Sequence, residues 1–68
     1  MTSSSKKLGQ NLKRIRTQKQ MSQGDIARAL DVDKGYISNI EHGKKNPTLS
    51  TLTRLAEALK VGVDDLIK

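Results

Sequence analysis

Residues 21–43, MSQGDIARALDVDKGYISNIEHG, decide the fold of this chain. The stretch predicts two short helices joined by a tight turn. Ser22 is a good N-cap for the first helix, and Asp25 lies where a carboxylate favours the positive end of the helix dipole. Ile26 and Leu30 then share one face of this helix. The apolar pattern breaks directly afterwards, which indicates the turn.

A second helix follows from about residue 33 to residue 42, with Asp33 as its N-cap and Gly43 suited to end it. Ile37 and Ile40 mark its core-facing side. At about 100° per residue, the opposite face and its flanks carry Lys34, Gly35, Tyr36, Ser38, Asn39, Glu41 and His42. Side chains of Ser, Asn and Lys hydrogen-bond base edges and phosphates, but they are also common on a solvated face. This helix alone leaves both interpretations open.

Composition bounds the class of protein. The chain has 68 residues, and 13 Lys and Arg against 7 Asp and Glu give a net charge of +6. This excess favours a polyanionic partner, nucleic acid before an anionic membrane. Tyr36 is the single Phe, Tyr or Trp residue, so binding of single-stranded nucleic acid by stacking of bases on aromatic side chains is disfavoured. With no Cys there is no disulfide or thiolate metal site, and we expect no cofactor and no metal.

The sequence also indicates the cellular location of the protein and the character of its first residues. No apolar run has the length of a membrane span and no signal peptide is visible, so we expect a cytoplasmic protein. Residues 1–5 are small and polar and predict a flexible tail before one domain over residues 6–68. Lys6 and Lys7 follow this tail, as part of a flexible start or as an arm that reaches a phosphate backbone.

Three more helices complete the prediction. The first runs from about residue 5 to 19, with a buried stripe at Leu8, Leu12 and Ile15, and with Gly9 as a small residue that allows close packing. Another runs from Thr48 or Leu49 to Leu59, with core positions at Leu49, Leu52, Leu55, Ala56 and Leu59. A last short helix covers residues 64–67. The pattern predicts an all-α protein, a compact five-helix bundle.

The segment between the third and fourth helices is basic. It reads Lys44-Lys45-Asn46-Pro47 and lies just beyond the exposed face of the third helix. An ordinary basic loop is one interpretation. Its position favours a loop that clamps phosphate groups.

Several stretches in order resemble the XRE family, the phage-repressor and Cro type of helix-turn-helix DNA-binding domain. They are residues 22–23, 26–27, 36–49 and 55–59, and the resemblance covers residues 6–67. It implies a five-helix domain whose second and third helices form the helix-turn-helix. It also implies that the third helix, about residues 33–42, lies in the major groove of double-stranded DNA, and that dimers bind palindromic operators.

The resemblance also implies roles for single residues. Positions that face bases correspond to Lys34, Gly35, Ser38 and Asn39. Contacts to the DNA backbone correspond to Gln23, His42, Lys44 and Lys45, and we add Tyr36 and Asn46 from their places on the helix flank and in the basic loop. Arg16 and Glu41 match an ion pair that ties the first helix to the end of the third. In many members Gly follows the first, second and fourth helices; here Gln20, Asp31 and Lys60 stand there, so we expect these ends to close differently.

Three functions compete at this point. The favoured one is a sequence-specific transcriptional repressor. The second is an adaptor of the same fold that binds a protein through the third helix. An enzyme is disfavoured, because the one His, His42, has no Cys or carboxylate cluster beside it in the sequence.

The C-terminal residues raise the question of self-association. Val63, Leu66 and Ile67 lie where little chain remains to cover them. They either close the core of the monomer or contact a second copy. We expect a homodimer, weak when free of DNA, with Leu66 or Ile67 against the two-fold mate.

Overall fold

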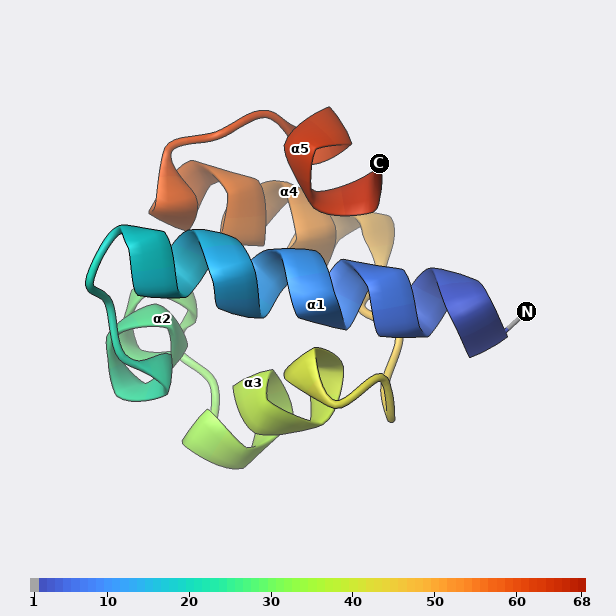
Figure 1. The fold of residues 1–68 in the computed structure, drawn as a ribbon. Helices are drawn as coiled ribbons and strands as arrows, with labels where there is room; N and C mark the ends of the chain where they lie inside the picture. Colours follow the sequence, from blue (N-terminus) through green and yellow to red (C-terminus); the bar gives the residue numbers. More distant parts are fainter. Residues whose placement is uncertain (1) are drawn as a thin grey trace.

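The computed structural model describes the backbone of residues 2–68 and the side chains from residue 5 onward. Its elements are α1 (Thr2–Gln18), α2 (Gln23–Leu30), α3 (Lys34–Glu41), α4 (Leu49–Leu59) and α5 (Val63–Ile67). Figure 1 shows α1 crossing the middle of the molecule, with α4 and α5 on one side and α2 and α3 on the other. The five-helix, all-α prediction is confirmed, and the described part of the chain contains no strand.

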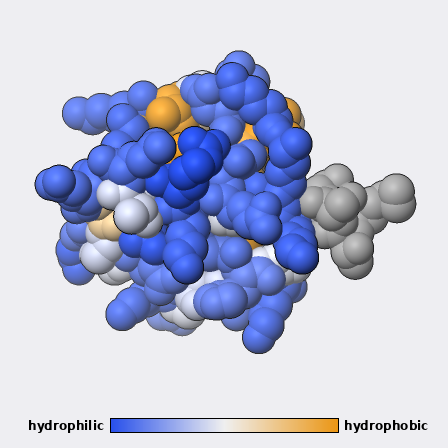
Figure 2. Space-filling model, viewed as in Figure 1, coloured by the Kyte–Doolittle hydropathy of each residue, from blue (hydrophilic) through white to orange (hydrophobic). Residues whose placement is uncertain are grey.

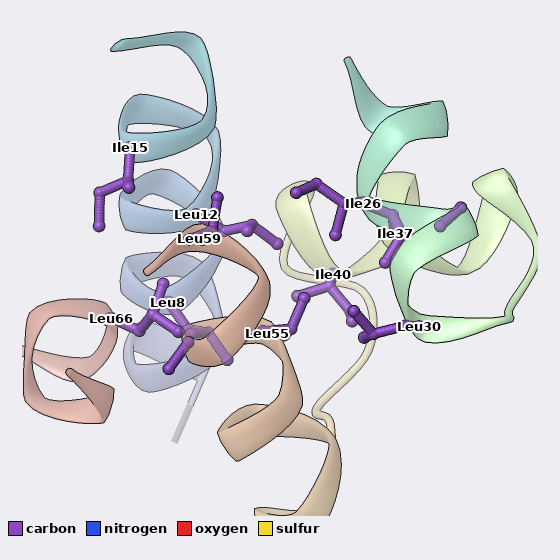
Figure 3. Packing of buried hydrophobic residues seen from close by; sticks show 12 residues of the cluster. Leu8, Leu12, Ile15, Ile26, Leu30, Ile37, Ile40, Leu55, Leu59 and Leu66 are labelled. Carbon is purple, nitrogen blue, oxygen red and sulfur yellow. The ribbon is translucent and has the colours of Figure 1, made fainter. Parts of the chain in front are cut away.

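The core is aliphatic and draws on every helix. Side chains of α1 and α4 meet those of the α2–α3 pair at the centre of the molecule (Figure 3). Fully buried members include Leu12, Ile26, Ile37, Ile40, Leu55, Leu59 and Leu66, each 0% exposed. No helix among the described residues has the length and apolar character needed to cross a membrane.

Local capping explains where two of the helices begin. The hydroxyl of Ser22 accepts from the backbone N–H of Asp25, and the Asp25 carboxylate accepts from the N–H of Ser22. Thr48 caps α4 by accepting from the N–H of Thr51 at 3.2 Å. Asp33 occupies the N-cap position of α3 but makes no side-chain cap hydrogen bond.

The expectation that three helix ends close differently is wrong. Gln20, Asp31 and Lys60 adopt φ angles of 59°, 60° and 60°, the left-handed conformation usually left to Gly. The following residue in each case donates its N–H to a carbonyl in the last turn of the helix, at 3.0 Å. Those residues, Met21, Val32 and Val61, also pack against the core. Hydrogen bonds and apolar contacts therefore offset a backbone cost of about 1–2 kcal/mol at each end.

The first helix starts earlier than predicted. Its backbone is helical from Thr2, where the sequence suggested a flexible tail through residue 5, and Met1 lies outside the described residues. Ser5 is 8% exposed and its hydroxyl is hydrogen-bonded, so it belongs to the packed domain.

The assignment of Leu49 to the core is wrong. Leu49 is 75% exposed, whereas Leu55 is 0% exposed. Each step of three residues along a helix turns by about 300°, which is about 60° short of a full turn. Two such steps separate Leu49 from Leu55, so the two side chains point about 120° apart around the helix axis. As the first residue of α4, it also lies beyond the helices that cover the rest of the stripe.

Leu66 cannot serve as the predicted dimer contact, because it is 0% exposed within one chain. It lies near Leu8 of α1 in Figure 3. The backbone carbonyl of Leu66 also accepts from Nδ2 of the buried Asn11 at 2.8 Å. This part of the dimer prediction is wrong, since α5 closes the core with Leu66 and leaves Ile67 56% exposed.

Candidate nucleic-acid interface

Helix α3 presents one open polar face. Lys34, Gly35 and Asn39 are exposed and Ser38 is half-buried, whereas Ile37 and Ile40 on the other side are fully buried. A Cβ built at Gly35 meets no atom of the described residues within 4 Å. The four residues expected to read bases therefore lie on the accessible side of one helix, and no packing constraint requires Gly at position 35.

His42, at the end of α3, turns back onto this face. Its Nδ1 lies 2.7 Å from the backbone oxygen of Ser38 and 3.4 Å from the Ser38 hydroxyl. Because a carbonyl oxygen only accepts, Nδ1 carries a proton in this arrangement. Nε2 remains as the ring nitrogen available to another partner.

The loop after α3 brings cations beside the same face. Lys44, Lys45 and Asn46 are all exposed. The ammonium of Lys45 lies 5.5 Å from the centre of the half-buried Tyr36 ring, a cation–π contact that holds the loop next to α3. Four of the six residues expected at the DNA backbone thus come from the first turn of α3 and this loop.

Gln23 has a partner that the sequence did not reveal. Its Nε2 donates to Oε1 of Glu41 at 2.9 Å. An amide nitrogen has two hydrogens, so one N–H remains for an external acceptor. The fold therefore orients the side chain of Gln23 through Glu41 and leaves the predicted phosphate contact open.

The ion pair implied by the resemblance is present. Nε of Arg16 lies 2.6 Å from Oε2 of Glu41, and Nη2 of Arg16 lies 3.1 Å from Oε1. Nη1 of Arg16 also donates to the backbone oxygen of Met21 at 2.8 Å. The side chains of Arg16 and Glu41 are 13% and 2% exposed. The network joins α1, the start of α2 and the end of α3.

Helix α1 lies directly against the last turn of α3 at Gly9. A Cβ at this position would lie 2.4 Å from the backbone oxygen of Ile40 and 2.5 Å from that of Glu41. Backbone atoms cannot give way as the end of a side chain can. The close approach anticipated for Gly9 is confirmed, and it fixes α3 against α1.

The start of α2 carries a perturbed carboxyl. The backbone N–H of Ser22 is the largest cause that lowers the pKa of Asp25, followed by the Ser22 hydroxyl, and Arg28 also lowers it. The carboxylate form thus stabilises the fold at any pH above its ordinary pKa. This contribution is lost as the pH falls through the lowered pKa of the folded state.

Two short helices at a tight turn, with an open polar face on the second, define a helix-turn-helix domain. Residues 12–66 match the family HTH_3, described as helix-turn-helix. The chain belongs to this XRE-type family of DNA-binding transcriptional regulators, which are not enzymes.

Known relatives agree with this assignment. The chain is 36% identical over 62 residues to the uncharacterized HTH-type transcriptional regulator y4dJ of Sinorhizobium fredii, covering 91% of this chain and 80% of that protein. It is 33% identical to the immunity repressor protein of Bacillus phage phi105, covering 88% of this chain but 42% of the repressor. The structure of the restriction-modification controller protein C.AhdI from Aeromonas hydrophila matches with a TM-score of 0.89 at 33% identity, covering 94% and 97% of the two chains.

The Glu41 network gives a first prediction. Glu41→Ala leaves the nearly buried guanidinium of Arg16 without its carboxylate, so we expect a loss of about 3–5 kcal/mol in unfolding free energy. Glu57→Ala, at an exposed site of α4, is the control and should have little effect. Thermal and urea denaturation followed by circular dichroism measure both. An unchanged stability of Glu41→Ala would contradict the structural role of the pair.

The two glycines that face opposite surroundings give a second prediction. Gly9→Ala forces the α1 and α3 backbones apart and should destabilise the fold by about 1–3 kcal/mol. Gly35→Ala meets open space and should stabilise α3 by about 0.5–1 kcal/mol. Urea titrations of the two variants compare them directly. A Gly9→Ala variant as stable as the wild type would show that the α1–α3 contact is not as close as described.

Proposed function

We propose that this chain acts in the cytoplasm as a transcriptional repressor that binds a palindromic operator as a homodimer. Membership of a family of DNA-binding regulators is the starting point. The observation that carries the proposal is the open polar face of α3, held rigidly from behind by Gly9 and Glu41. The repressor role is supported by the likeness to a phage immunity repressor.

Base reading falls to three side chains of α3. Asn39 suits the paired donor and acceptor of adenine in the major groove, and Lys34 suits guanine or a nearby phosphate. Ser38 donates to either kind of base, and Gly35 allows the helix backbone to approach the groove closely. All four positions lie on the accessible side of α3.

The groups around this face supply the part of the affinity that does not depend on the DNA sequence. Lys44 and Lys45 neutralise phosphates and release counterions. The free N–H of Gln23, the hydroxyl of Tyr36, the amide of Asn46 and, when protonated, Nε2 of His42 supply further donors. A phosphate oxygen only accepts, and each of these groups has a hydrogen to give.

A homodimer is supported by apolar surface that the monomer leaves uncovered. Ile67 is 56% exposed at the end of α5 and Leu49 is 75% exposed at the start of α4. Figure 1 places these two helix ends on the same side of the molecule, and apolar patches surface around α5 in Figure 2. We propose that the two-fold mate covers both side chains, with its α3 about 34–36 Å from the first. So small a patch fits a dimer that is weak until DNA completes it.

Selection of bound sequences from a random duplex pool tests the function directly. The expected product is a palindrome with half-sites about one helical turn apart. Salt-dependent binding to duplex DNA separates this function from an adaptor that binds protein through α3. A pool that yields no enriched sequence would contradict sequence-specific recognition.

Two substitutions should then weaken binding in different ways. Asn39→Ala should cost about 1–3 kcal/mol at the selected operator and relax one base position. Lys45→Ala should weaken operator and random duplexes alike and lower the salt slope by about 0.9 for each phosphate that the lysine no longer neutralises. Anisotropy titrations at several salt concentrations measure both. If Asn39→Ala keeps the wild-type ratio of operator to random affinity, the base-reading role is wrong.

Self-association is tested at Ile67. Ile67→Ser removes apolar surface without adding charge, and because the residue is exposed the variant should fold. We expect it to bind a single half-site as the wild type does, and to lose cooperative binding to the palindrome. Sedimentation with and without DNA gives the stoichiometry. One protomer per palindrome at saturation for the wild type would rule out the dimer.

A further inference from the structure

We infer that the first turns of α1 extend the DNA-contacting surface, with Ser5 positioning the amide of Asn46 and Lys6 adding a cation beside Lys44. The inference rests on the proposed function, because it assigns two more residues to the same surface. Neither Ser5 nor Lys6 belongs to the helix-turn-helix itself, since both precede residue 12, where the family match begins.

The contact between Ser5 and Asn46 joins residues 41 apart in sequence. The hydroxyl of Ser5, in the second turn of α1, donates to Oδ1 of Asn46 in the loop after α3. Ser5 is 8% exposed, whereas Asn46 is exposed. A buried hydroxyl thus holds one end of a side chain that otherwise faces solvent.

The chemistry of the amide gives this contact a direction. Asn has one acceptor oxygen and one donor nitrogen, and a phosphate oxygen can pair with the nitrogen alone. Because Ser5 occupies the oxygen, the N–H groups of Asn46 are left to face an external acceptor. Without Ser5 the amide can turn over and present its oxygen, which repels a phosphate.

Backbone packing places Lys6 beside the lysines of the loop. A Cβ at Gly43, whose φ is +74°, would lie 3.2 Å from Cα and 3.6 Å from Cβ of Lys6. Lys44 is the next residue in the chain, and both lysines are exposed. The two ammonium groups therefore start from adjacent backbone segments. A phosphate within reach of Lys44 is then also within reach of Lys6.

The test uses the full chain, a random-sequence duplex and the selected operator. Lys6→Gln should lower the slope of log affinity against log salt by about 0.9 per protomer on both duplexes. Lys60→Gln is the matched control. Lys60 lies at the far end of α4, about 16 Å along the helix axis from Leu49, the first residue of that helix. Lys60→Gln should leave the slope unchanged.

Ser5 is tested by variants that separate positioning from stability. Ser5→Ala should lower affinity for both duplexes roughly 3- to 10-fold, the range for removal of one hydrogen bond, and Ser5→Thr should restore it. Asn46→Asp keeps the acceptor for Ser5 but removes the donors, so it should weaken binding more than Ser5→Ala. Ethylation of single phosphates near Lys44 should interfere with wild-type binding, and the Lys6→Gln complex should lose part of that interference. A general loss of stability would not remove interference at particular phosphates, and thermal denaturation of each variant measures that stability in parallel.

The outcomes are distinct. Wild-type binding with an unchanged slope for Lys6→Gln and unchanged affinity for Ser5→Ala would overturn the inference and leave the proposed function standing. A wild-type chain without salt-dependent duplex binding would overturn the proposed function, and the inference with it.

Discussion

The buried carboxylate of Glu41 is the interaction on which the arrangement of the first three helices depends. It lies at the carbonyl end of α3, where a negative charge is disfavoured by the helix dipole. Arg16 from α1 and Gln23 from α2 compensate with three donated hydrogen bonds. A buried anion with even one of these donors displaced would cost several kcal/mol, so the helices are held in one relative position.

That constraint has a functional consequence. Base recognition requires side chains placed to within a fraction of an ångström, and α3 is only 8 residues long. Its end is fixed by Glu41 and by the backbone contact at Gly9, and its inner side by the fully buried Ile37 and Ile40. A domain without disulfides can therefore present a rigid polar face. The side chains on that face are not needed to hold the fold together, apart from His42, whose Nδ1 is hydrogen-bonded to the backbone oxygen of Ser38.

The same packing distributes the positive charge. Lys45 is held beside α3 by its contact to Tyr36, and the backbone of Lys6 lies next to the loop through the packing of α1 on Gly43. Arg16 is different, because its charge is neutralised inside the fold by the ion pair with Glu41. Net charge alone does not separate cations that bind a partner from cations that stabilise the domain.

The sequence by itself determined the five helices, the cap at Ser22 and the core of α2 and α3, because these depend on spacing within a few residues. The resemblance supplied the Arg16–Glu41 pair. Only the tertiary structure decided that Leu66 is covered, that Leu49 is not, and that Ser5 meets Asn46. Burial at a helix end depends on which distant element lies over it, and left-handed caps at non-Gly residues depend on the apolar contact that follows them. Local patterns carry neither kind of information.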